Sequence, residues 1–485
     1  MSLCRWIFCL CSLVIGASSS KHVAAELPLP MNPSSLPRDV ALASLATHAD
    51  REQQYALFLP PGYDPAARPE QRWPVLFIFD PRGRALESLR LAVDGARRNG
   101  WVVISSYQSR SDTDEALTLN AIRALLGEVQ QHIAFDPRRL YFAGMSGTAK
   151  TLWSVMPSMD GVMAGMIGCG GARPSEYGKF RVAPPDFFGM AGTEDFNHAE
   201  MREQDTVLEK SGTPHRLDIF NGRHGWPEDS ATFTRAIDWL QLMAMREGRI
   251  ERSDDFINAE FEATQAWIEA AADALDRRER LDQAIRDFDN LRDTSAWQSA
   301  SSTLTHDQRL HDIQKRQKRL DAAESRFARD FDGWFTRFTQ RFANGQRQDP
   351  PSTSDSFREL RIASLQKDAD DADWRVADSA KRRLERAFVA TSFYLPNAMI
   401  ALHDHDRAVR SLEIAIRIFP DRAGPHWRLA RLQATDKDVN AAFRELHRSR
   451  QLGYLDVDDL RDSPDWTSLR SDPRWKTLLT SEDKP

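Results

Sequence analysis

Short apolar runs alternate with amphipathic stretches between about residues 53 and 249 of the chain. The stretches 115–133 and 230–245 carry apolar residues at helical spacing, whereas the apolar runs are short enough to be buried strands. This alternation is typical of β-α units around a mostly parallel sheet with helices on both faces, an α/β fold. We expect seven strands, at residues 55–59, 73–80, 101–105, 140–143, 163–167, 187–191 and 216–220.

The pattern changes at residue 250. Neither glycine nor proline occurs between Arg249 and Asp332, charges of both signs are dense, and apolar residues recur three or four positions apart. We therefore predict a charged helical region over 250–344. A polar stretch over 345–356, with two adjacent prolines, is interpreted as a linker to a second helical region over 357–482.

The second helical region contains an internal repeat with an offset of 34 residues. Four positions of the first unit match four of the second: Leu395, Ala408, Leu412 and Ala415 match Leu429, Ala442, Leu446 and Ser449. This period resembles that of tetratricopeptide repeats, and the resemblance implies a surface for a protein partner. An ordinary helical bundle with a chance period is the alternative.

The N-terminus has the pattern of a signal peptide. Arg5 precedes an apolar run over residues 6–17, and small residues follow near Ser19 and Ala25. The run of about 12 residues is shorter than the ~20 needed to cross a bilayer, although an uncleaved anchor is the alternative. We expect a signal peptide over 1–25, an N-terminal extension over 26–52, and a periplasmic or secreted bacterial protein without a stable membrane span after cleavage.

Composition narrows the class of protein. The 485 residues are 41% hydrophobic and 28% charged, which is typical of a folded chain with several domains. The net charge of -6, without a run of basic residues, argues against a nucleic-acid partner. Of the four cysteines only Cys169 lies beyond the predicted cleavage site, so the mature chain forms no internal disulfide.

A candidate nucleophile follows the strand expected at 140–143. Gly144, Met145, Ser146 and Gly147 stand between this strand and an amphipathic stretch over 148–156, which gives strand, sharp turn and helix. A nucleophile elbow needs this arrangement because the turn is strained and tolerates only small neighbours. The N–H of Gly147, at the start of the helix, is then placed to stabilise an oxyanion. Thr148 stands where the Gly-x-Ser-x-Gly pattern has its last glycine.

A serine nucleophile needs a histidine base and a carboxylate that orients the histidine, and the next strands are each followed by such a residue. The loop 192–197 follows the strand expected at 187–191 and carries Glu194 and Asp195. His224 lies in a glycine-flanked loop after the last expected strand. We predict a triad of Ser146, Asp195 and His224, with Glu194 as the substitute carboxylate.

The loop after the strand expected at 73–80 is the candidate for a second oxyanion donor. Pro81 has no N–H, so the backbone of Arg82 or of a neighbouring residue is the predicted donor. The Arg82 side chain is a candidate contact for an anionic part of the substrate, with a solvent-facing arginine as the alternative. Tyr107, Phe196 and Trp226 are candidates for lining the acyl pocket, although core packing explains them equally well.

Four segments together resemble bacterial α/β-hydrolases of the carboxylesterase and poly(hydroxyalkanoate) depolymerase-like group. They are residues 79–83, 144–147, 192–197 and 224–227, and the resemblance extends over about residues 53–249. It implies an α/β-hydrolase catalytic domain that cleaves a small ester through an acyl-enzyme, with no metal and no organic cofactor.

Other chemistries have weaker support in the sequence. No paired Cys-x-x-Cys, no His-Glu-x-x-His helix and no Walker loop is present. His403 and His405 lie among aspartates in an expected turn, where a solvated turn is favoured over a metal site. Two alternatives to an esterase stay open: a serine peptidase with the same triad, and an inactive hydrolase-fold scaffold whose helical repeats bind a partner.

Overall fold

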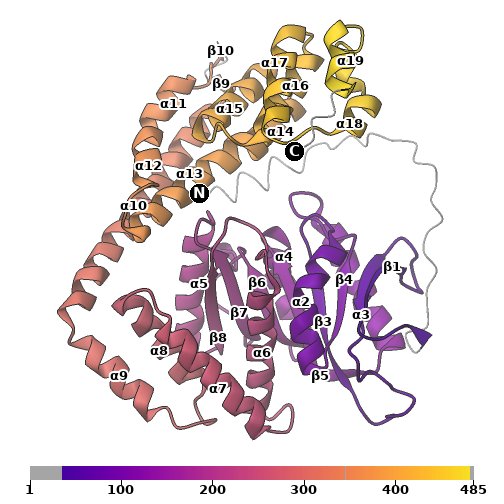
Figure 1. The fold of residues 1–485 in the computed structure, drawn as a ribbon, viewed down its shortest axis with the longest axis vertical. Coiled ribbons are helices and arrows are strands. Elements are labelled where there is room, and N and C mark those ends of the chain that lie inside the picture. Colours follow the sequence, from indigo (N-terminus) through magenta and orange to yellow (C-terminus); the bar gives the residue numbers. More distant parts are fainter. Residues whose placement is uncertain (1–34, 344–345, 481–485) are drawn as a thin grey trace. The chain divides into compact units, whose positions relative to one another are not determined.

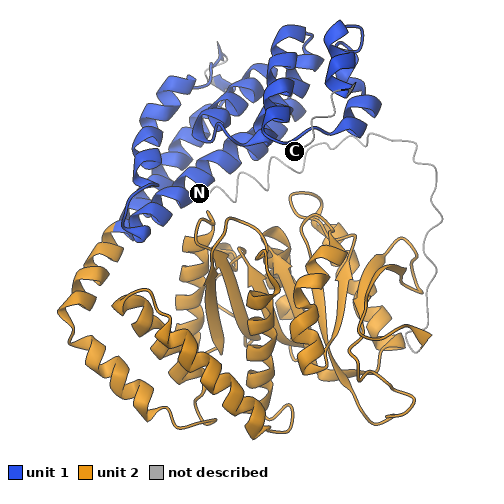
Figure 2. Cartoon of the chain, viewed as in Figure 1, with its two compact units in different colours: residues 1–17, 320–485 blue, residues 18–319 orange. Residues whose placement is uncertain are grey.

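The computed structural model describes residues 35–343 and 346–480, so the predicted signal peptide lies outside the described residues. The chain forms two compact units, and the boundary between them falls after Arg319 (Figure 2). We call residues up to 319 the α/β unit and residues from Leu320 onward the helical unit. No helix among the described residues is long and apolar enough to cross a membrane.

The α/β unit is built on an eight-stranded sheet with the order β1-β2-β4-β3-β5-β6-β7-β8 (Figure 1). Strands β3 to β8 are parallel, while β2 is antiparallel to both β1 and β4. The predicted α/β-hydrolase fold class is therefore confirmed. The strands are β1 Ala41–Ala46, β2 Gln54–Phe58, β3 Trp73–Phe79, β4 Val102–Ser106, β5 Phe135–Met145, β6 Met163–Cys169, β7 Asp186–Gly192 and β8 His215–Phe220.

All seven expected strands are present, and β1 is an additional one. It lies in the stretch 26–52, which we had expected to be an extension outside the catalytic fold. The strand is irregular because its register shifts between Leu42 and Leu45, and Ser44 has a positive φ of 55°. It is also partly exposed, as an edge strand can be, so its sequence lacks a clean alternation of apolar and polar residues.

Helices cover both faces of the sheet. One core cluster joins the sheet to α2 Ala85–Asn99 and α6 Ser230–Arg246. A second cluster joins it to α3 Glu115–His132, α4 Gly147–Val155 and α5 His198–Ser211. Strand β3 supplies alternate residues to the two clusters, which explains why its sequence is apolar throughout.

Three helices of the charged region pack on the core of the α/β unit. They are α7 Asp254–Glu269, α8 Ala274–Asp287 and α9 Ser295–Thr305, whose apolar faces join the cluster of α2 and α6. Asp287 of α8 is buried and accepts a hydrogen bond from Trp239 Nε1 at 2.8 Å. The change of pattern at residue 250 therefore marks a change of secondary structure, while the compact unit continues to Arg319.

The helical unit begins within α10 Gln308–Thr339, which continues across the boundary. The segment 345–356, expected to be a linker, contains strand β10 Gln346–Arg347 and the start of α11 Thr353–Glu359. Repeat residues Ala408 and Leu412 in α15, and Ala442 and Leu446 in α17, are all buried. The helical character of this half is confirmed, and its tetratricopeptide-like nature stays a prediction. The other elements are β9 Phe342–Ala343, β10 Gln346–Arg347, α11 Thr353–Glu359, α12 Ile362–Asp368, α13 Trp374–Val389, the π-helix η4 Ala390–Tyr394, α14 Leu395–Ala401, α15 His405–Ile418, α16 Ala423–Thr435, α17 Val439–Gln451, α18 Val457–Asp462 and α19 Pro473–Thr480.

Candidate active site

Ser146 occupies the sharp turn between β5 and α4. Its backbone has φ 54° and ψ -121°, a conformation that costs free energy for any residue with a side chain. The turn also needs two small neighbours: a Cβ on Gly144 would lie 2.7 Å from Ala149 N, and one on Gly147 would lie 2.5 Å from Ser111 Cβ. The Ser146 N–H donates to Cys169 O at 2.7 Å, which ties the turn to β6. This geometry is that of a nucleophile elbow.

Thr148 stabilises the elbow, although the sequence pattern has glycine at this position. Its buried hydroxyl accepts a hydrogen bond from Met145 N–H at 3.0 Å. The same oxygen lies 2.5 Å from Phe79 O and 2.9 Å from Met145 O, within donating distance of both carbonyls. The threonine therefore links the turn to the end of β3.

His224 lies between Ser146 and Asp195. Its Nε2 is 2.9 Å from Ser146 Oγ, and its Nδ1 is 2.8 Å from Asp195 Oδ1. When Nδ1–H donates to the carboxylate, the Nε2 lone pair faces the serine hydroxyl, which is the arrangement that general-base catalysis requires. The structure thus brings together all three predicted triad residues.

The loop after β7 places Asp195, and not Glu194, beside the histidine. The Asp195 carboxylate has no exposed surface, and its Oδ1 also accepts from Asn197 N–H at 2.7 Å. The loop passes close to the histidine loop at Gly192, where a Cβ would lie 2.3 Å from Gly222 O. Asn197 fixes a third segment by donating from Nδ2 to Gly170 O at 2.8 Å.

The N–H groups of the two predicted oxyanion donors, Gly147 and Arg82, differ in whether they already have a partner. Gly147 stands at the first position of α4, where backbone N–H groups have no partner within the helix. The N–H of Arg82, by contrast, donates to Asp80 Oδ1 at 2.8 Å, so it is not free to bind an oxyanion. The prediction of Arg82 as a backbone donor is wrong in this geometry, because Asp80 folds the loop around its own carboxylate.

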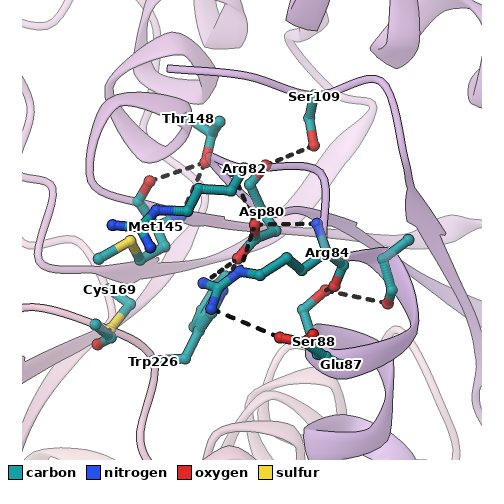
Figure 3. A network of polar contacts seen from close by, with 12 residues as sticks. Asp80, Arg82, Arg84, Glu87, Ser88, Ser109, Met145, Thr148, Cys169 and Trp226 are labelled. Carbon is teal, nitrogen blue, oxygen red and sulfur yellow. Dashed lines mark hydrogen bonds and ion pairs between the residues drawn. The ribbon is translucent and has the colours of Figure 1, made fainter. Parts of the chain in front are cut away.

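Asp80 is the centre of a buried network beside the elbow (Figure 3). Besides Arg82 N–H, its carboxylate accepts from the N–H and guanidinium of Arg84, and its Oδ2 accepts from Trp226 Nε1 at 3.0 Å. Its backbone oxygen accepts from Ser109 Oγ at 2.8 Å. Burial alone would raise the pKa of Asp80, but the hydrogen bonds from Arg84 and Arg82 hold it below its ordinary value.

This network connects the loops after β3, β4 and β8. Its central residue, Asp80, was not predicted as a site residue. The sequence places Asp80 at the end of an expected strand and in the segment 79–83, but without a role of its own. An acid at the carboxyl end of a buried strand is nevertheless a signal of a buried polar site. Ser111, whose Cβ lies against Gly147, gave no sequence signal. Its neighbour Gly147 is more than thirty residues away along the chain, and only the sheet brings them together.

The three residues predicted to line the acyl pocket lie in different surroundings. The Phe196 ring packs on His224, with ring centroids 4.2 Å apart, and so borders the candidate site. Trp226 packs on Phe233 with its ring nitrogen bonded to Asp80, and Tyr107 packs against the core cluster of α2 and α6. The structure gives the last two a packing role.

The aspartates next to His405, Asp404 and Asp406, form contacts within the helical unit. Asp404 is fully buried and bonded to Arg407 at 3.1 Å, while His405 lies 2.5 Å from Asp436. His403 is exposed in a turn, as expected, whereas Asp404 is buried and His405 begins α15.

Comparison with known protein families finds no family that matches the chain, and no curated protein matches it. Solved structures resemble its α/β part. S-formylglutathione hydrolase FrmB from Staphylococcus aureus is 13% identical, over 39% of this chain and 90% of that protein, with a TM-score of 0.33. Esterase LipW from Mycobacterium marinum is 18% identical, over 40% and 78%, with a TM-score of 0.32. A puromycin-hydrolyzing peptidase from Mycobacterium tuberculosis is 15% identical, over 40% and 38%, with a TM-score of 0.31. The likeness is one of fold and assigns no activity.

Proposed function

We propose that this chain is an exported serine hydrolase that cleaves small carboxylic esters. The observation that carries the proposal is the continuous line of contacts from Ser146 Oγ through His224 to the buried Asp195, starting at a serine with positive φ. A strained nucleophile aligned with a histidine and a carboxylate is the arrangement of acyl transfer enzymes.

The proposed reaction has two halves. Ser146 Oγ attacks the ester carbonyl while His224 Nε2 takes the hydroxyl proton, and the charged imidazole is stabilised by Asp195. The negative oxygen of the tetrahedral intermediate is stabilised by the Gly147 N–H and the N-terminal end of α4. His224 then protonates the leaving alcohol. A water molecule, deprotonated by His224, attacks the acyl-enzyme and releases the acid.

A panel of nitrophenyl esters and nitroanilides tests this proposal on the mature protein. We expect ester turnover that falls by about 10³-fold or more in Ser146→Ala and His224→Ala. Ser154→Ala is a matched control, because Ser154 lies on the same α4 helix and its hydroxyl bonds Glu115. Faster amide turnover would favour the peptidase alternative. No turnover of any substrate would favour the scaffold alternative.

Export is tested separately from chemistry. In a bacterial host, we expect the full chain to be shortened near Ser19 or Ala25 and to be recovered outside the cytoplasm. N-terminal sequencing of the recovered protein checks the cleavage site. A full-length product in the cytoplasm would contradict export without affecting the proposed chemistry.

A further inference from the structure

Two histidines and a glutamate meet at the β1 edge of the sheet, outside the candidate active site. His48 lies in the loop between β1 and β2, and Glu128 and His132 lie one turn apart on α3. One possible ligand atom from each residue lies within 4.8 Å of the other two. The sequence alone does not show this cluster, because His48 stands 80 residues before Glu128.

Glu128 is a buried carboxylate whose ion-pair partner among the described residues is a histidine and not a lysine or arginine. Only 3% of its side chain is exposed. It accepts hydrogen bonds from His48 N–H at 2.9 Å and from Tyr55 OH at 3.1 Å, and it lies 2.8 Å from His48 Nδ1. Because a buried charge is costly unless it is compensated, a cation bound beside this carboxylate is stabilised.

His132 brings a ring nitrogen that has no hydrogen-bond partner among the described residues. This atom, Nε2, is buried, where an unsatisfied polar atom is unfavourable. The ring stacks on that of His48, with centroids 3.7 Å apart and planes inclined by 27°. An imidazole donates to a metal from the lone pair in its ring plane, so the two rings bind one ion when His48 turns out of this stack.

We propose that His48, Glu128 and His132 bind a divalent cation of the zinc class. Two imidazole nitrogens and one carboxylate oxygen form a donor set that suits zinc, and the fourth position is left for water. Tyr55 OH and His48 N–H already hold the carboxylate, as outer-sphere hydrogen bonds do in metal sites. The donors must close to about 3.3 Å from one another, and His48, whose side chain is 34% exposed, has room to turn.

The role that follows is structural. Strand β1 pairs only with β2 within the described sheet, and the loop that carries His48 joins these two strands at the edge. A metal bound by this loop and by two successive turns of α3 ties the edge hairpin to the helix. Metal binding then contributes directly to the free energy of unfolding.

Calorimetric titration of the metal-free mature protein with zinc chloride tests the site independently of catalysis. We expect one equivalent to bind, with affinity weakened about tenfold or more in Glu128→Gln and in His132→Ala. His405→Ala is the matched control, because His405 pairs with Asp436 in the helical unit, and it should bind zinc like the unmodified protein. Calcium chloride at the same concentration should not bind, since calcium prefers an all-oxygen site.

Thermal unfolding gives a second readout. Zinc should raise the Tm of the unmodified protein and of His405→Ala, and leave that of His132→Ala unchanged. His132 is partly exposed at the end of α3, so this variant keeps the test available if Glu128→Gln does not fold. The proposal is overturned if about 100 µM zinc does not bind to the unmodified protein, if His132→Ala binds zinc equally well, or if calcium binds as tightly as zinc.

Discussion

Asp195 in the α/β unit and Asp404 in the helical unit are both fully buried carboxylates, but their surroundings differ. Asp404 lies within 3.2 Å of nitrogens of three arginines, Arg341, Arg347 and Arg407. Asp195 faces a single imidazole, and its Oδ2 has no hydrogen-bond partner among the described residues. Arginines are always charged and neutralise Asp404 permanently. In the proposed mechanism the imidazole carries a proton only transiently, and the Asp195 carboxylate is placed to stabilise that charged form.

Arg407, the cation of the Asp404 pair, also has a structural role. It donates to the carbonyl oxygens of Phe338 and Gln340 at 3.0 and 2.8 Å, and also to that of Gln348. The pair therefore holds the end of α10 and the segment after β10 against α15. The buried charge of Asp404 thus holds segments of the helical unit together, whereas that of Asp195 lies in line with His224 and the Ser146 hydroxyl.

The largest expected effect comes from the two adjacent acids of the α/β unit. Asp195→Asn should lower kcat for a nitrophenyl ester by about 10³- to 10⁴-fold, because His224 would lose the acceptor that fixes its tautomer. Glu194→Gln should leave kcat unchanged, since the carboxylate at hydrogen-bond distance from His224 Nδ1 is that of Asp195. Steady-state kinetics of both variants check this contrast. Equal losses in the two variants would mean that the loop, and not the Asp195 carboxylate, supports catalysis.

Removing the charge of Arg407 in the helical unit should lower stability without changing kcat. Arg407→Met leaves Asp404 and three carbonyls with fewer donors, so we expect the free energy of unfolding of this unit to fall by about 3–5 kcal/mol. Arg410→Met, on the same helix, should change it by less than about 0.5 kcal/mol, because Arg410 forms only a loose surface pair with Glu413. Urea unfolding measures both values. A kcat of the folded protein that fell with Arg407→Met would break the division of roles.

Thr148 tests whether the elbow depends on its extra hydroxyl. Thr148→Val should cost about 1–3 kcal/mol of stability, because Met145 N–H and Phe79 O would lose a buried partner. Thr148→Ser retains the hydroxyl and should recover most of this loss. Thermal unfolding compares the two variants. If valine were tolerated as well as serine, the contact with the end of β3 would have no energetic role.

The smallest expected effect is the pH dependence of the Asp80 network. The folded state holds the pKa of Asp80 below its unfolded value of about 3.9, so its contribution to stability is present above that pH and is lost as pH falls through the folded value. The stability difference between the unmodified protein and Asp80→Asn should therefore shrink below about pH 4. Denaturant unfolding at pH 7 and pH 3 measures it. A difference that grew in acid would contradict the assigned direction.

Local pattern predicted much of the α/β unit. Buried parallel strands are short apolar runs, so the seven runs and the order serine, acid, histidine could be found in sequence. Strand β1 was not predicted because a bulge between Leu42 and Leu45 breaks its alternation of apolar and polar residues. The packing of α7 to α9 on the sheet was not predicted either, since the sequence of an amphipathic helix does not indicate which core its apolar face joins.

The finer features of the site depend on contacts between residues far apart in the chain. Asp80 and Trp226 are separated by 146 positions, so the local sequence gives no sign of their hydrogen bond. The choice between Asp195 and Glu194 depends on the direction in which a loop turns after β7. Adjacent acids give the same sequence signal, and only the three-dimensional path separates them.

The most direct test of the account is covalent labelling with a fluorophosphonate, followed by peptide mass spectrometry of the mature protein. The account predicts a single modified peptide that contains Ser146, with labelling greatly slowed in His224→Ala and absent in Ser146→Ala. Labelling at a different serine, or no labelling of the folded protein, would contradict the assignment of Ser146 as the nucleophile.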